Sequence, residues 1–146
     1  MTELIFVDTN VLLYWKSEQS TTKRTAATQW IEAILEAGAG RISYQVLVEY
    51  QANVARVSPG TPPTETRETV RRLYSWEPVA VDSTILESAW RIQDRYGISW
   101  WDALIVAAAE TAGCEYLLTE DLQDGQRFGA VTVVDPFVHE PAGYVG

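Results

Sequence analysis

The amino-acid sequence predicts an α/β protein, a three-layer α/β/α sandwich around a mainly parallel central sheet of about five strands. Short apolar segments alternate with longer segments in which apolar residues recur at helical spacing, as expected for parallel strands joined by helices. Residues 4–7 are four consecutive apolar residues, which suits a central strand covered on both faces. A chain of 146 residues can bury roughly two-thirds of its unfolded surface as one domain. We therefore predict a single domain over residues 1–146, with a loosely held tail at about 136–146.

The first half of the chain contains two strands, each followed by a helix, with one more helix between them. The predicted elements are a strand at 4–7, a helix at 11–15, a helix at 24–37, a strand at 41–43 and a helix at 44–57. Gly38 ends the second of these helices, because glycine readily adopts the left-handed conformation at a helix C-terminus. A polar connection at 17–22 joins the first two helices.

The second half begins with a proline-containing loop at 58–63, which cannot continue a regular element. The predicted elements that follow are a helix at 64–75, a strand at 79–81, a helix from 82 or 83 to 96, a helix at 99–112, a strand at 116–118 and a strand at 130–134. Pro78 makes the strand at 79–81 an edge strand, because proline lacks the donor that a central strand needs. The helix at 99–112 is the most apolar and should lie centrally.

Composition and charge narrow the possible classes of function. A net charge of −9 disfavours a general nucleic-acid binder or a membrane-surface protein, because an acidic surface repels phosphate groups. Cys114 is the only cysteine and His139 the only histidine, so neither an internal disulfide nor a histidine-based zinc site is expected. No apolar run is long enough to span a bilayer. We expect a soluble, cytoplasmic protein.

Two acids lie just beyond the ends of predicted strands. Asp8 comes after the strand at 4–7, and Asp121 comes three residues after the strand at 116–118. In open α/β sheets, ligands bind beyond the carboxyl ends of the strands, so both acids are candidates for one site. Asp8 could equally cap the helix that follows it, and Asp121 could belong to an acidic turn before Gly125.

Two further acids lie on predicted helices. Asp102 stands three residues after Ser99, a spacing that also fits a capping box at a helix N-terminus. Its position at the mouth of a very apolar helix implies partial burial, which is costly for a charge without a partner. Glu49 falls among the polar residues of the helix at 44–57, where exposure to solvent is the simpler interpretation.

The four acids together are stronger evidence for a functional site than any one of them alone. Two at strand ends and two on the early turns of helices can converge on one cleft. Four neighbouring carboxylates repel one another, so such a site is stable at neutral pH only with a bound divalent cation. Ligands that are all oxygens favour Mg²⁺, with Mn²⁺ as the alternative, over zinc.

Four short motifs, residues 6–10, 43–50, 101–105 and 117–121, follow one another along the chain. In these motifs and in their order the chain resembles the PIN-domain family, and most of all the VapC-type toxin ribonucleases of toxin–antitoxin systems. This resemblance implies a PIN-like fold in which Asp8, Glu49, Asp102 and Asp121 are the catalytic, metal-binding acids. The supporting polar residues are then Thr9, Asn10, Ser43, Thr119 and Asp124. The segment after Asp121 departs from the commonest pattern, which leaves open whether Asp121 or Asp124 completes the site.

The function expected from this resemblance is a Mg²⁺-dependent endoribonuclease, in which metal-activated water cleaves RNA phosphodiester bonds. The expected partners are an RNA substrate, a cognate antitoxin protein and a second copy in a homodimer, without a membrane. One alternative is a non-catalytic PIN scaffold that binds RNA or protein. A phosphatase-like phosphoryl-transfer enzyme is less favoured, because it needs a late lysine and none follows Lys23.

Overall fold

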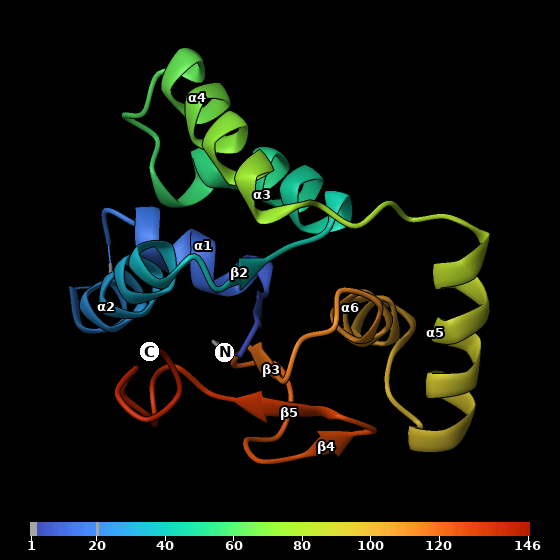
Figure 1. The fold of residues 1–146 in the computed structure, drawn as a ribbon. Coiled ribbons are helices and arrows are strands. Elements are labelled where there is room, and N and C mark those ends of the chain that lie inside the picture. Colours follow the sequence, from blue (N-terminus) through green and yellow to red (C-terminus); the bar gives the residue numbers. More distant parts are fainter. Residues whose placement is uncertain (1–2, 20) are drawn as a thin grey trace.

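A five-stranded sheet lies at the centre of the computed structural model, which describes residues 3–19 and 21–146 (Figure 1). The strands are β1 (Ile5–Val7), β2 (Gly40–Arg41), β3 (Tyr116–Leu118), β4 (Arg127–Phe128) and β5 (Val131–Val134), in the spatial order β2-β1-β3-β5-β4. Every pairing in this sheet is parallel except that of β4 with β5. The mainly parallel sheet of about five strands predicted from the sequence is confirmed.

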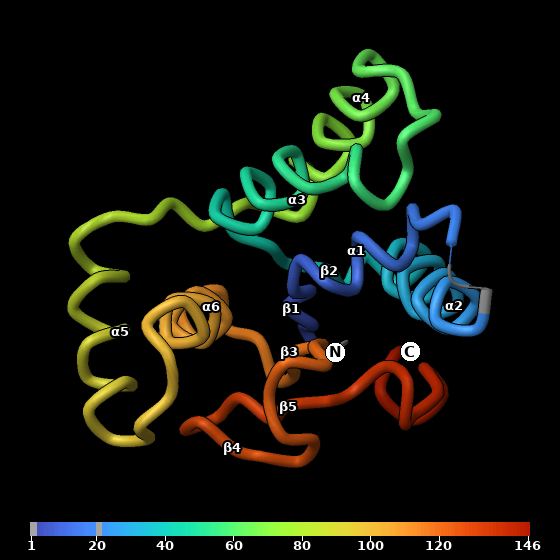
Figure 2. The backbone as a smooth tube through the Cα atoms, turned by 180° about the vertical axis from the view of Figure 1, so that it is seen from behind, coloured from blue at the N-terminus to red at the C-terminus, as the bar shows by residue number. Residues whose placement is uncertain are grey.

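Helices cover both sides of this sheet. They are α1 (Thr9–Lys16), α2 (Thr21–Ala37), α3 (Tyr44–Val57), α4 (Pro63–Leu73), the 3-10 helix η1 (Tyr74–Trp76), α5 (Ser83–Tyr96) and α6 (Trp100–Thr111). Helices α1 and α2 lie on one side of β1 and β3, whereas α6 and α5 lie on the other, and α3 and α4 project as a pair beyond them (Figures 1 and 2). The predicted three-layer sandwich is therefore confirmed. No helix of the described residues combines the length and the apolar character needed to cross a membrane.

Short polar side chains fix the starts of the helices that lead to the site. Asp8 accepts a hydrogen bond from the backbone of Thr9 at the start of α1, and the Ser43 hydroxyl accepts one from Val46 in α3. Ser99 accepts one from the backbone of Asp102 in α6. Such caps satisfy N–H groups that have no partner within the helix. The same residues thus define where each helix begins at the carboxyl edge of the sheet.

The core follows from the apolar pattern of the sequence. The three residues of β1 are completely buried, and α6 is buried continuously over residues 103–109. Gly40 in β2 lies against the ring of Trp76, and a Cβ atom at this glycine would lie only 2.3 Å from that ring. A glycine is therefore required where the aromatic ring crosses the edge strand.

One predicted strand is wrong, and one observed strand is missing from the prediction. Residues 79–81 do not form an edge strand, because Val79 makes only an isolated bridge with Ser43. The edge of the sheet beyond β5 is instead the two-residue strand β4, which is too short to give a period in the sequence. On α5, Trp90 is half exposed and stacks on Trp100, with the ring centroids 6.4 Å apart.

The C-terminal segment, residues 136–146, packs on the domain rather than leaving it as a loose tail. The Trp30 indole N–H donates to the carbonyl oxygens of Pro136, at 3.2 Å, and of His139, at 2.9 Å. The Tyr144 ring contacts the rings of Trp30 and Tyr116. Apolar spacing could not indicate this packing, because it depends on single aromatic residues meeting a tryptophan far away in the sequence.

Candidate metal centre

Asp8 and Thr119 meet at the carboxyl edge of the sheet. Strands β1 and β3 pair in parallel with Val7 opposite Leu118, so the residue after each strand reaches the same edge. The Thr119 hydroxyl donates to Asp8 Oδ2 at 2.8 Å. Both side chains are buried, with Asp8 only 6% exposed. The sheet register thus places a nearly buried carboxylate at the point where a parallel sheet binds ligands.

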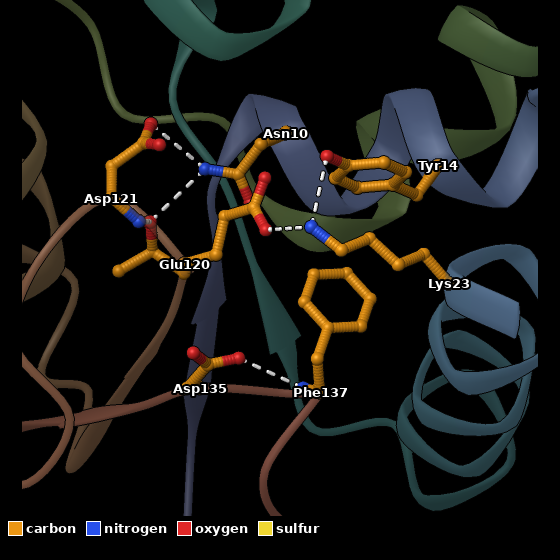
Figure 3. Close-up of polar contacts among 8 residues, drawn as sticks. Asn10, Tyr14, Lys23, Glu120, Asp121, Asp135 and Phe137 are labelled. Atoms are coloured by element: carbon orange, nitrogen blue, oxygen red, sulfur yellow. Dashed lines mark hydrogen bonds and ion pairs between the residues drawn. The ribbon is translucent and has the colours of Figure 1, made fainter. Parts of the chain in front are cut away.

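Asn10 connects this carboxylate with Asp121. Its Nδ2 atom donates to Asp121 Oδ2 at 2.9 Å and to Thr119 Oγ1 at 3.1 Å, and it lies 3.3 Å from Asp8 Oδ2. Figure 3 shows the Asn10 amide directed at Asp121. The backbone N–H of Asp121 also donates to the Thr119 hydroxyl, at 3.1 Å. One amide and one hydroxyl therefore hold two carboxylates near each other without direct contact.

Glu49 approaches the same place from helix α3. The Thr9 hydroxyl, next to Asp8, donates to Glu49 Oε2 at 2.8 Å, and the Gln45 amide donates to Glu49 Oε1 at 3.0 Å. Glu49 is thus not a freely solvated residue, although it lies on the polar side of its helix. Asp102, in the first turn of α6, is close enough for its carboxylate to be influenced by the charges of Asp121 and Glu49. All four predicted acids therefore belong to one electrostatic neighbourhood.

Burial dominates the electrostatics of this neighbourhood. It raises the pKa of Asp8 from its ordinary value of 3.8 to about 7. Hydrogen bonds from Thr119 and Thr9 lower that pKa in part, while the charges of Asp121 and Glu49 raise it further. Burial also raises the pKa of Asp102, and Asp121 and Glu49 act in the same direction. A positive charge at this position would relieve both carboxylates.

Two of the supporting residues lie outside this cluster. Asp124 accepts hydrogen bonds from the backbone of Asp135, at 3.0 Å, and shares one with His139 Nε2, at 2.8 Å. The bond from Asp135 and the nearby His139 hold the pKa of Asp124 below its ordinary value. Ser43 is buried and caps α3. Of the two acids that the sequence left as alternatives, Asp121 is the one beside Asn10, and Asp124 is bound elsewhere.

The chemistry of the cluster fits a hard divalent cation. Its donors are carboxylate, hydroxyl and amide oxygens, the kinds of ligand that Mg²⁺ prefers. Asn10 Oδ1 is buried and has no hydrogen-bond partner among the described residues, so this oxygen could still accept a contact from a bound ligand. In the described part of the chain, no three acidic, histidine or cysteine side chains stand close enough to hold an ion as they are.

Two contributors to the site were not identified as such from the sequence. Gln45 lies four residues before Glu49, a spacing that places the two side chains together on a helix. Lys23 of α2 forms an ion pair of 2.7 Å with Glu120, the neighbour of Asp121, and lies 3.3 Å from the Tyr14 hydroxyl (Figure 3). No pattern in the sequence indicates the ion pair between Lys23 and Glu120, because 97 residues separate them.

The fold and the acidic cluster define the class of α/β proteins that carry a carboxylate site at the carboxyl edge of a mainly parallel sheet. The PIN domain matches residues 5–126, and the chain belongs to the PIN domain family. The resemblance inferred from four short motifs is thereby confirmed. A comparison with curated protein sequences gives no significant match.

Solved structures share this fold at low sequence identity. A toxin–antitoxin complex from Klebsiella pneumoniae has a TM-score of 0.64 at 20% identity, over 94% of this chain and 98% of that chain. FitAcB from Neisseria gonorrhoeae has a TM-score of 0.64 at 21% identity, over 92% and 99%. VapC20 of Mycobacterium tuberculosis, a toxin that cleaves the sarcin–ricin loop, has a TM-score of 0.59 at 19% identity, over 77% and 86%. At these identities the likeness establishes the fold.

Proposed function

We propose that the protein is a divalent-metal-dependent endoribonuclease and the toxin of a toxin–antitoxin pair. The observation that carries this proposal is the nearly buried Asp8 carboxylate. Asp121 and Glu49 act on it electrostatically, the same two acids that act on Asp102, and no lysine or arginine of the described residues forms an ion pair with it. A buried, unpaired carboxylate is costly, and a metal ion would remove that cost. Membership of the PIN family and the shared fold with toxin structures support the same function.

Each residue of the cluster has a distinct part in this proposal. Asp8, Glu49, Asp102 and Asp121 would hold Mg²⁺ or Mn²⁺, which when bound supplies Lewis-acid activation of water and neutralises charge on the phosphodiester. Thr9 orients Glu49, and Thr119 orients Asp8, each through the hydroxyl hydrogen bond described above. Asn10 holds Asp121 beside Asp8. Such second contacts commonly fix the orientation of metal ligands.

Whether Asp121 or Asp124 is the fourth acid of the site can be tested directly by replacing each in turn. We expect Asp121→Asn to lower Mg²⁺-dependent cleavage of single-stranded RNA by about 10- to 100-fold or more. Asp124→Asn should leave cleavage nearly unchanged, because Asp124 binds Asp135 and His139 instead. The measurement is the initial rate on a fluorescent RNA at saturating Mg²⁺. A larger loss of cleavage in Asp124→Asn than in Asp121→Asn would contradict the proposed site. If neither the variants nor the wild type cleave RNA, the result would favour a non-catalytic scaffold.

An apolar surface beside the cluster supports the proposal of a homodimer. Of the eight large hydrophobic side chains exposed in the described chain, five line two adjoining grooves on α3, η1, α6 and the segment before α5. They are Tyr44, Val48, Tyr74, Val81 and Trp101. An apolar patch of this kind suits a self-complementary contact between identical subunits. We propose that a second copy covers it, next to Glu49.

A charge placed in that surface should separate the subunits. Val48 is 67% exposed, so Val48→Arg can be accommodated in the monomer but would bury an unpaired charge in the dimer. We expect sedimentation velocity to show a dimer for the wild type and a monomer for the variant. Leu35→Arg on α2, at a residue 46% exposed and outside both grooves, is the matched control and should remain dimeric. A wild type that is monomeric at high concentration would contradict the proposed dimer.

A further inference from the structure

A groove of about 270 Å³ leads away from the candidate metal centre along helix α1. One wall is a single face of α1 together with the residue that caps its C-terminus; it is formed by Asn10, Leu13, Tyr14 and the cap Ser17, which are spaced as neighbours on a helix surface. Asn10 is also the residue that binds Asp121, so the groove begins at the site. At 1.5 Å per residue, this face of α1 is about 10 Å long, which suits a short stretch of a single strand.

Helix α3 supplies the far end of the groove. Helices α1 and α3 lie side by side, since Thr9 binds Glu49 near their starts and the backbone of Glu18 binds the carbonyl of Val57 near their ends. The polar side of α3 carries Glu49 at the metal centre and Arg56 at the groove. Seven residues separate the two, which is about 10 Å along the helix. Arg56 therefore stands about two helical turns from the proposed metal ligands.

The charges in this groove favour an anion. Arg56 is exposed, and no ion pair or hydrogen bond engages its guanidinium group within residues 3–19 and 21–146. Glu120 is the one acid that lines the groove, and Lys23 neutralises it at 2.7 Å. Figure 3 shows that the Lys23 ammonium group lies at the Glu120 carboxylate, beside Tyr14 and Phe137. In a chain of net charge −9, this groove thus presents a local positive charge next to an acidic site.

We propose that single-stranded RNA reaches the metal centre along this groove and that Arg56 binds one of its backbone phosphates. This inference rests on the proposed ribonuclease function and names the path of its substrate. An arginine fork suits a phosphate group, and the apolar wall at Leu13 and Tyr14 offers a surface for sugars and bases. A phosphate held about 10 Å from the metal centre would set the register of the strand over the acids.

The test compares two charge-neutral substitutions on exposed arginines. Arg56→Gln should raise the KM for a short fluorescent single-stranded RNA by about tenfold, the effect of losing one charge-assisted contact, with kcat unchanged. Arg67→Gln on α4, an exposed arginine that does not line the groove, removes the same charge elsewhere and should leave KM unchanged. An equal rise in KM for both variants would mean a general charge effect and would overturn the proposal.

A second readout identifies the contact as a phosphate. With Asp8→Asn present to prevent cleavage, binding of the same RNA is measured by anisotropy from about 50 to 200 mM KCl. Arg56→Gln should reduce the slope of log affinity against log salt by about 0.7, the value for one phosphate of a single strand. An unchanged slope together with Arg56-dependent binding of a polyglutamate peptide would assign the groove to an acidic polypeptide and overturn the inference. If the wild type cleaves no RNA at all, the proposed function is wrong. If the wild type cleaves RNA and Arg56→Gln cleaves it with the same KM, only the inference about the groove is wrong.

Discussion

Replacing Asp8 by asparagine is expected to lower RNA cleavage by about a hundredfold or more, an effect comparable to losing a key electrostatic group in other enzymes. Asp8 is the most buried of the four acids and lies next to both Thr119 and Asn10. The fold should persist, because the amide oxygen of asparagine can still accept the hydrogen bond from the backbone of Thr9. Without metal, the variant should be more stable than the wild type, since a buried negative charge is removed.

Cleavage and unfolding should be measured on the same preparations. Asp94→Asn is a suitable control, because Asp94 is exposed on α5 and its replacement makes the same change of charge. We expect this control to retain wild-type cleavage and melting temperature. Substantial cleavage by Asp8→Asn would remove Asp8 from the chemistry and leave it as a helix cap.

The stability of the metal-free protein is expected to fall as pH rises from about 4 to about 7 and to level off above that range. The pKa of Asp8 is raised in the folded protein to about 7 from 3.8. The contribution of Asp8 to the free energy of unfolding is therefore fully present below about pH 4 and is lost as pH rises through about 7. The total loss is of order 4 kcal/mol. Asp102 acts in the same direction. Asp124, whose pKa is lowered, loses its contribution only as pH falls below its ordinary value of 3.8.

Mg²⁺ should reverse this loss above neutral pH. At about 100 times its Kd, an ion that binds only the folded protein stabilises it by about 2.7 kcal/mol, or roughly 5–10 °C in melting temperature for a domain of this size. Asp102→Asn should show a smaller rise, because one ligand is lost. Thermal melts at about pH 5.5 and 8, in EDTA and in Mg²⁺, measure both effects. An equal rise in wild type and Asp102→Asn would leave Asp102 as a helix-cap residue only.

The sequence was most informative where one physical pattern dominates. The bounds of α3 and of β3 agree with the ranges predicted, 44–57 and 116–118, because helical spacing and a continuous apolar run are both unambiguous there. Residues 79–81 have the composition of a strand, but only Val79 pairs with the chain beside it, through a single bridge to Ser43. Pairing is a long-range property, and composition alone does not determine it.

The outline of the candidate site could be predicted from the expected order of parallel strands. Parallel neighbouring strands bring Asp8 and the residues after β3 to one edge, so their proximity follows from the topology. The polar side of α3, read as solvent-facing, turns toward the site, because Thr9 binds Glu49 there. The choice between Asp121 and Asp124 depended on partners far away in the sequence, Asn10 for the first and His139 for the second.

The central claim is that the acids around Asp8 hold a divalent cation, which activates water for the hydrolysis of RNA. The chemical groups at the ends of the cleavage products test this claim most directly. Single-stranded RNA should be incubated with the purified protein in EDTA and then in Mg²⁺ or Mn²⁺, and the products identified by mass spectrometry. Attack by water with the 3′-oxygen as the leaving group predicts intact RNA in EDTA, and in metal fragments that carry 5′-phosphate and 3′-hydroxyl ends. Cleavage in EDTA, or products with 2′,3′-cyclic phosphate ends, would contradict the claim.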